Sequence, residues 1–129
     1  MRVILIAGLV LVAGCKKHSQ PTLPQIPDSN AVAGGGNSEL AEATLFHSVY
    51  RYTGHANAVI AFYAPEMEKR GARPATGGFA DDNIEHTGGF GSTGFAAPKD
   101  PTKPGVWLAV QEVQDATYID IWESVPKPQ

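Results

Sequence analysis

The sequence has little cysteine and no excess of positive charge. Cys15 is the single cysteine among 129 residues, so no disulfide can form within the chain. Ten Lys and Arg stand against 13 Asp and Glu, with no basic stripe that would follow a phosphate backbone. We therefore expect no nucleic-acid partner. The length suggests one domain, and clustered glycines and prolines indicate that the packed part is smaller than the chain.

The sequence also has no apolar run long enough to span a bilayer. The run at residues 3–13 (VILIAGLVLVA) is well below the ~20 residues that a membrane-spanning helix needs. It follows Arg2 and ends in small residues, and this combination is typical of a secretory signal peptide. We therefore predict a signal peptide over residues 1–14.

The four residues Val12-Ala13-Gly14-Cys15 resemble the lipobox of bacterial lipoproteins. The resemblance implies that the Cys15 thiol takes a diacylglycerol through a thioether, that a signal peptidase cuts between Gly14 and Cys15, and that the freed amine is acylated. Two or more acyl chains hold a protein stably on a membrane, whereas one does so only reversibly. The alternatives are an ordinary cleaved signal or an uncleaved anchor, and Val12-Ala13-Gly14 fits an A-x-A cleavage site poorly.

Lys16 follows the modified cysteine. In enterobacterial lipoproteins an Asp at this place retains the protein in the inner membrane. The resemblance therefore favours the outer membrane over the inner membrane.

Residues 15–38 are rich in proline and glycine and show no apolar periodicity. Proline favours an extended chain, and the triplet at residues 34–36 favours a flexible one. We predict that the lipidated Cys15 and a tether occupy residues 15–38, that a small domain occupies residues 39–126, and that residues 127–129 form a tail.

Within the domain, residues 45–52 (LFHSVYRY) are rich in strand formers, and a short helix over residues 38–42 is an alternative start. In such a strand Leu45, His47, Val49 and Arg51 would face one side, and Phe46, Ser48, Tyr50 and Tyr52 the other. Further along, an apolar stripe at helical spacing predicts a helix that ends near Gly71. The stripe consists of Val59, Phe62, Tyr63 and Met67. Pro65 lies inside this helix and predicts a kink or a break.

Residues 106–122 form two runs around Gln114-Asp115-Ala116, which predicts a β-hairpin. Side chains alternate between two faces along each run: Val106, Leu108 and Val110 against Trp107, Ala109 and Gln111 in the first, and Thr117, Ile119 and Ile121 against Tyr118, Asp120 and Trp122 in the second. Residues 83–87 form a further short strand candidate. The expected fold class is α+β: a small antiparallel sheet of three to four strands with one helix packed on one face. Phe62 and Met67 should pack on the apolar side of the hairpin.

The helical segment from Ala58 to Gly71 (AVIAFYAPEMEKRG) resembles an FYxxxMxxxG pattern in small uncharacterised bacterial lipoproteins. In that pattern a Trp follows the glycine, whereas this chain has Ala72. The resemblance implies strands after the helix, and it implies no activity.

Two glycine motifs lie between the helix and the hairpin. Residues 89–94 (GFGSTG) match G-x-G-x-x-G, but Pro98 follows where a phosphate-binding helix would have to run, so a flexible loop is favoured. The sequence TGGF occurs at residues 76–79 and 87–90. Its phenylalanines either tuck against the sheet edge, the favoured interpretation, or present aromatic tips to a ligand.

Asp82, Glu85 and His86 carry oxygen and imidazole groups that would suit a metal. Their spacing matches neither a calcium loop nor a paired-histidine zinc motif, so a solvated acidic turn is favoured. A grouping of Ser92 with His86 and Asp82 rests on residue type alone.

These observations favour a non-enzymatic binding or accessory module of the cell envelope, facing the periplasm. Its expected partners are the membrane, through lipid on Cys15, and an envelope protein or cell-wall component. We predict no catalytic residue, no metal and no cofactor. The alternatives are an envelope hydrolase that uses a metal near Asp82, Glu85 and His86, and a structural filler without a binding site.

Overall fold

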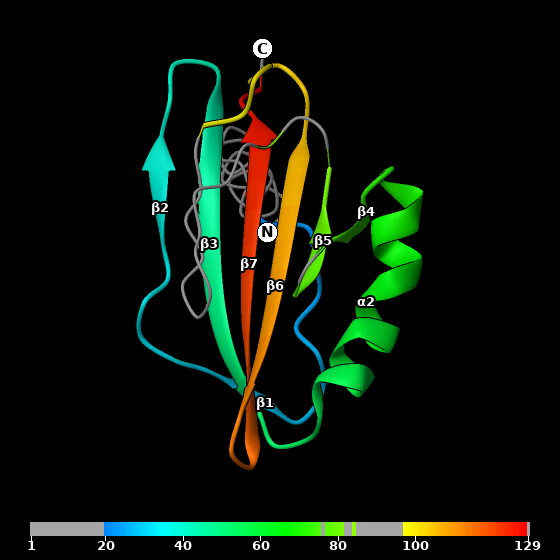
Figure 1. Cartoon of the computed structure of the whole chain (residues 1–129). Coiled ribbons are helices and arrows are strands. Elements are labelled where there is room, and N and C mark those ends of the chain that lie inside the picture. Colours follow the sequence, from blue (N-terminus) through cyan, green and yellow to red (C-terminus); the bar gives the residue numbers. More distant parts are fainter. Residues whose placement is uncertain (1–19, 76, 82–83, 85–96, 129) are drawn as a thin grey trace, which may run out of the picture.

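The computed structural model describes residues 20–75, 77–81, 84 and 97–128. In this part of the chain, one helix accompanies a seven-stranded antiparallel sheet (Figure 1). The predicted α+β class is confirmed, but the prediction of three to four strands is wrong. The extra strands are segments of three or four residues, too short to show the alternation by which strands are found in a sequence.

The strands follow the order β1-β3-β7-β6-β5-β4 across the sheet, and β2 also pairs with β3. Their bounds are β1 Ser29–Ala31, β2 Gly36–Glu39, β3 Ala43–Tyr52, β4 Arg73–Ala75, β5 Gly78–Ala80, β6 Gly105–Val113 and β7 Ala116–Pro126. The predicted hairpin is β6–β7, with Val113 opposite Ala116 across its turn. The predicted strand at residues 45–52 is β3, and the alternative helix at residues 38–42 does not form.

The sheet has two different faces, because side chains alternate along each strand. One face, the helix face, carries Val106 and Leu108 of β6 and Ile119 and Ile121 of β7, all at most 3% exposed. The opposite face, the tryptophan face, carries Trp107 and Trp122, which pack with Ile84. The assignment of hairpin residues to faces is as the sequence predicts.

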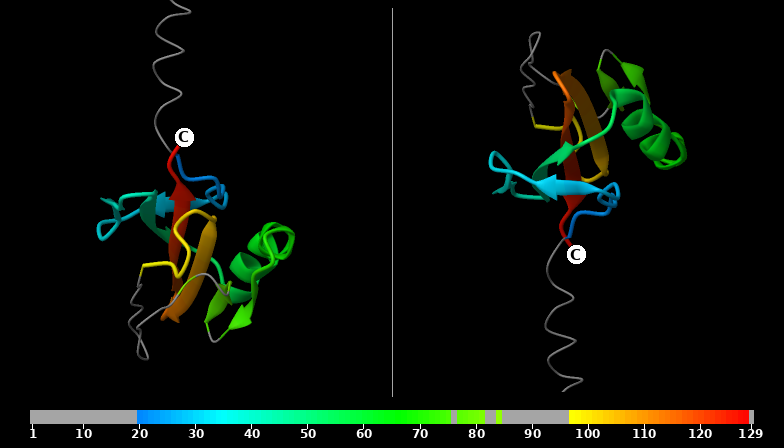
Figure 2. Two further views of the ribbon diagram at one scale, coloured as in Figure 1. Left: turned by 90° about the horizontal axis from the view of Figure 1, so that it is seen from above. Right: turned by 90° about the horizontal axis from the view of Figure 1, so that it is seen from below.

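Helix α2, Ala56–Lys69, covers the helix face with Val59, Tyr63 and Met67, which are fully buried. Burial of a large apolar side chain stabilises the fold by roughly 1.5–3 kcal/mol. Phe62, which the sequence places in this contact, is instead 37% exposed and lies edge-on to Tyr63. The end views show that the sheet is twisted and that α2 lies beside its β5–β6 half (Figure 2).

The helix runs through Pro65 as one element, so of the two predicted alternatives, a kink or a break, the break does not occur. Pro65 and Ala61 are both exposed, so water can solvate the Ala61 carbonyl that proline leaves without its usual donor. No helix in the described residues is both long and apolar enough to cross a membrane.

Both ends of α2 are held by specific contacts. At the start, His55 makes no side-chain cap, and Glu112 of β6 instead accepts the Ala56 N–H at 2.9 Å. At the end, Gly71 has φ +77°, and the Ala72 N–H reaches the Met67 carbonyl at 3.0 Å. This is the left-handed glycine that the sequence predicts after the helix.

The segment before Glu39 differs most from its prediction as a tether. Residues 20–28, here called the strap, run between the sheet and α2, and Ile26 is 4% exposed in the core. Strands β1 and β2 then pair in succession with the same edge of β3. Packed structure therefore begins well before Glu39, because the strap contacts α2 and β7, which lie far along the chain.

Strand β5 requires a glycine. A Cβ on Gly78 would lie 1.6 Å from the Leu108 carbonyl oxygen, so the two backbones approach closely only because no side chain intervenes. Phe79 beside it is 5% exposed and belongs to the core. This agrees with the interpretation that the first TGGF phenylalanine tucks against the sheet.

Candidate functional site

His47 and Trp122 stack on the tryptophan face. They lie directly opposite each other on β3 and β7. Their ring centroids are 4.2 Å apart, and the ring planes are 7° from parallel. Trp107 of β6 is paired with Trp122 in turn, so three ring-bearing residues form one row across the sheet.

Asp120 fixes the orientation of the imidazole. It lies two residues before Trp122 on β7 and therefore on the same face. Its Oδ1 is 2.8 Å from His47 Nε2, and both side chains are about a quarter exposed (27% and 28%). The ring is thus held from its edge by a carboxylate and from its face by an indole, while part of it still reaches solvent.

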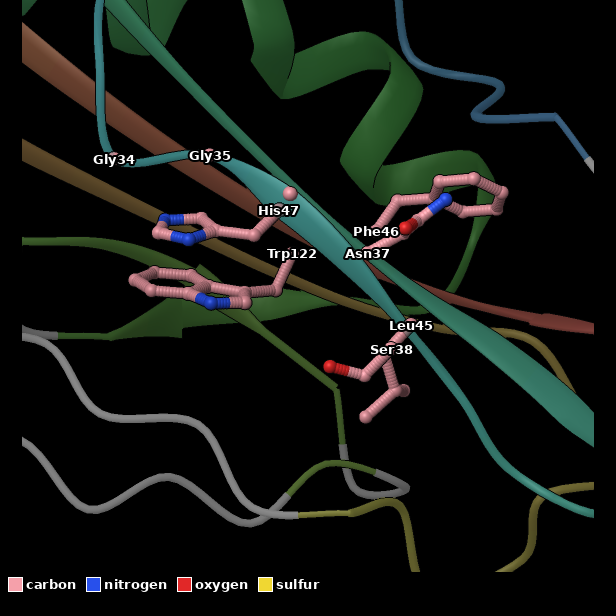
Figure 3. A pocket seen from close by; sticks show the side chains of 9 residues that line it. Gly34, Gly35, Asn37, Ser38, Leu45, Phe46, His47 and Trp122 are labelled. Atoms are coloured by element: carbon pink, nitrogen blue, oxygen red, sulfur yellow. The ribbon is translucent and has the colours of Figure 1, made fainter.

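A hollow of about 410 Å³ opens beside this pair. Its walls are residues 34–38, residues 45–47 and Trp122. Figure 3 shows His47 and Trp122 stacked on one side and the Ser38 and Leu45 side chains on another, with the Gly34–Gly35 backbone above the imidazole. We call this the His47 hollow.

Two glycines shape the wall of the hollow that residues 34–38 form. A Cβ on Gly35 would lie 2.6 Å from the His47 carbonyl oxygen, which is closer than real side chains approach. Gly34 has φ +117°, a conformation that residues with side chains rarely adopt. The triplet that the sequence suggests as a flexible linker therefore has a defined role: it brings the β2 backbone close to β3.

The groups that line the hollow are suited to binding a ligand. It presents the His47 imidazole, the Trp122 indole, the Ser38 hydroxyl and glycine backbone. Within the described residues His47 is bonded to Asp120 and makes no hydrogen bond with Ser38, so the serine, histidine and aspartate are not linked as in a nucleophilic triad. Such a mixed aromatic and polar lining suits a neutral polar ligand or a peptide segment.

The described part of the chain contains no group of three or more His, Cys, Asp or Glu residues that would hold a metal ion. Asp82, Glu85 and His86, the metal candidates from the sequence, lie outside the described residues, as do Ser92, the G-x-G-x-x-G segment and the predicted strand at 83–87 apart from Ile84. Gly14 and Cys15, the predicted processing and lipidation residues, lie outside them as well.

Sequence reasoning did not find the His47 hollow. The alternation predicts His47 on one face of its strand and both Asp120 and Trp122 on one face of theirs, and both predictions are confirmed. What it lacked was the pairing of β3 with β7, two strands separated by the helix and the glycine-rich region. A histidine and an acidic residue at matching positions on two long strands were the available signal.

No protein-family model, no curated protein and no solved structure matches this chain.

Proposed function

We propose that this protein is a bacterial lipoprotein of the cell envelope, held in a membrane by acyl chains on Cys15, with a folded domain that binds an envelope component. The lipid anchor is supported by the sequence Val12-Ala13-Gly14-Cys15, which follows a short apolar run. Lys16 after the cysteine favours the outer membrane. The domain is a non-enzymatic binding or accessory module that faces the periplasm.

The observation that supports a binding role is the His47 hollow. The stacked pair and Asp120 are preorganised, because each ring is held before any ligand arrives, and preorganisation lowers the entropic cost of binding. The Ser38 hydroxyl, on the exposed strand β2, lines the same hollow. An envelope protein segment or a cell-wall component would dock between residues 34–38 and the stacked rings of His47 and Trp122.

The test of the binding role is site-specific photo-crosslinking in intact cells. A photoreactive residue at Ser38 lines the hollow, and one at the exposed Asp115 in the hairpin turn serves as the control at the other end of β7. We expect a discrete adduct at position 38 that His47→Ala abolishes, and no such adduct at position 115. Equal adducts at both positions, or an adduct indifferent to His47→Ala, would contradict binding in the hollow.

A further inference from the structure

Glu123 is a buried carboxylate whose partners come mainly from the strap. It lies on the helix face of β7 and is 3% exposed. Its Oε1 accepts the backbone N–H groups of Thr22 at 3.0 Å and of Leu23 at 2.9 Å, and its Oε2 accepts the Thr22 hydroxyl at 2.6 Å. An ionised group is costly to bury unless it is hydrogen-bonded and paired, so these donors are what permit a carboxylate here.

Arg70 completes the arrangement from the end of α2. Its Nη1 lies 3.5 Å from Glu123 Oε2 and donates to the Thr22 hydroxyl oxygen at 2.7 Å. The Thr22 hydroxyl thus donates to the carboxylate and accepts from the guanidinium. We call Glu123, Arg70, Thr22 and Leu23 the Glu123 clasp, which joins the strap to both the sheet and the helix.

A second set of hydrogen bonds fixes the strap just after the clasp. The Tyr63 hydroxyl donates to the Pro24 carbonyl at 2.7 Å and accepts the Ile26 N–H at 3.1 Å. Ile26 itself is buried in the core. The strap is therefore fixed at successive points from Thr22 to Ile26.

The clasp changes the length of chain available between the proposed lipid anchor and the domain. If the tether ended at Glu39, the 24 residues from Cys15 would reach at most about 85 Å when extended. Ending at Thr22, the seven residues from Cys15 reach at most about 25 Å. Glu123 also follows Trp122 directly, so the clasp and the His47 hollow lie at the same level of the sheet.

We infer that the Glu123 clasp makes the tether seven residues long and holds the Trp122 end of the domain beside the bilayer surface. This inference rests on the proposed lipid anchor at Cys15. The component that enters the His47 hollow is accordingly one that lies close to the membrane, rather than one reached across a long flexible spacer.

Two insertions of the same seven-residue Gly/Ser segment test the tether length in the full-length lipoprotein, reconstituted in phosphatidylethanolamine–phosphatidylglycerol vesicles. One insertion lies between Ser19 and Gln20, before the clasp, and the other between Ala33 and Gly34, after it. Asp115→Cys supplies a dye site in the exposed hairpin turn, because lipid consumes the Cys15 thiol. Energy transfer from this dye to an acceptor on the lipid headgroups reports the distance of the domain from the bilayer.

We expect the first insertion to lower energy transfer, since it adds up to about 25 Å of reach. The second insertion should leave energy transfer unchanged. Equal decreases for the two insertions would overturn the short tether, because a spacer that ends at Glu39 would lengthen in both cases.

Amide hydrogen exchange tests the clasp independently of the membrane. The Thr22 and Leu23 amides should be protected, and Glu123→Gln should speed their exchange by about tenfold or more. The matched control is Glu112→Gln, which removes a carboxylate that holds the Ala56 amide instead. Unprotected amides in the wild-type protein would overturn the clasp. Protected amides on a chain without acyl groups would establish the clasp but overturn the membrane placement together with the anchor.

Discussion

Trp122 and Glu123 are adjacent on β7, and their side chains lie on opposite faces of the sheet. Trp122 stacks on His47 with a centroid separation of 4.2 Å, while Glu123 accepts the Leu23 N–H at 2.9 Å. The alternation of a strand places these side chains back to back. A shift of β7 by one residue would exchange them and place the carboxylate under the imidazole, so one register specifies both the hollow and the clasp.

Glu123→Gln should destabilise the fold by about 2–4 kcal/mol. The substitution leaves the strap amides facing a neutral group with fewer acceptor sites, and it leaves Arg70 without its buried partner. Denaturant unfolding measures the change. Glu112→Gln is the control, because its carboxylate also accepts a backbone amide but is exposed, and a larger loss there would contradict the importance of the clasp.

Gly78→Ala should cost about 3 kcal/mol or more, since its methyl group would overlap the Leu108 carbonyl and force β5 away from β6. Gly36→Ala is the matched control in another strand, where a Cβ meets nothing within 4 Å. Thermal unfolding of the two variants compares them. A similar midpoint for both would show that β5 does not approach β6 as closely as described.

His47→Ala should make Trp122 more accessible to solvent without unfolding the sheet. The imidazole covers one face of an indole that is 6% exposed. Acrylamide quenching of tryptophan fluorescence, in a Trp107→Phe background, measures this accessibility. His55→Ala is the control, because His55 is largely exposed and pairs with Glu112 away from the indole. Equal quenching in the two variants would contradict the stack.

Stability should fall in strong alkali because of Tyr63. Burial raises the pKa of Tyr63 from its ordinary value of 10 to about 12. A raised pKa in the folded state contributes stability that is complete below pH 10 and is lost as the pH rises toward 12, by up to about 2–3 kcal/mol. Unfolding by urea at pH 9 and pH 11.5, compared between wild type and Tyr63→Phe, measures this contribution. An identical pH dependence in the two proteins would contradict the buried hydroxyl.

Local patterns were enough to predict β3, the β6–β7 hairpin and the glycine after α2. In each case the signal lies within one segment: alternation in the strands and a glycine at a helix end. The face assignment of the hairpin residues followed from the same alternation. These features depend on short-range geometry that a sequence displays directly.

The strap and the short strands depend on distant partners. Ile26 stands alone between prolines, and its segment is ordered by Tyr63 and Glu123, which lie about 40 and 100 residues further along the chain. β2 (GNSE) is polar throughout and exists because it pairs with β3. The exposure of Phe62 likewise depends on how α2 lies against the sheet, which the spacing of apolar residues does not specify.

Both the proposed location and the short tether depend on lipid at Cys15, which mass spectrometry of the intact N-terminal peptide from the membrane fraction detects. We expect a mature chain that begins at Cys15 with a thioether-linked diacylglycerol, and a Cys15→Ser variant that is neither cleaved nor modified there. A mature chain that begins at Cys15 with a free thiol, recovered from the soluble fraction, would contradict it.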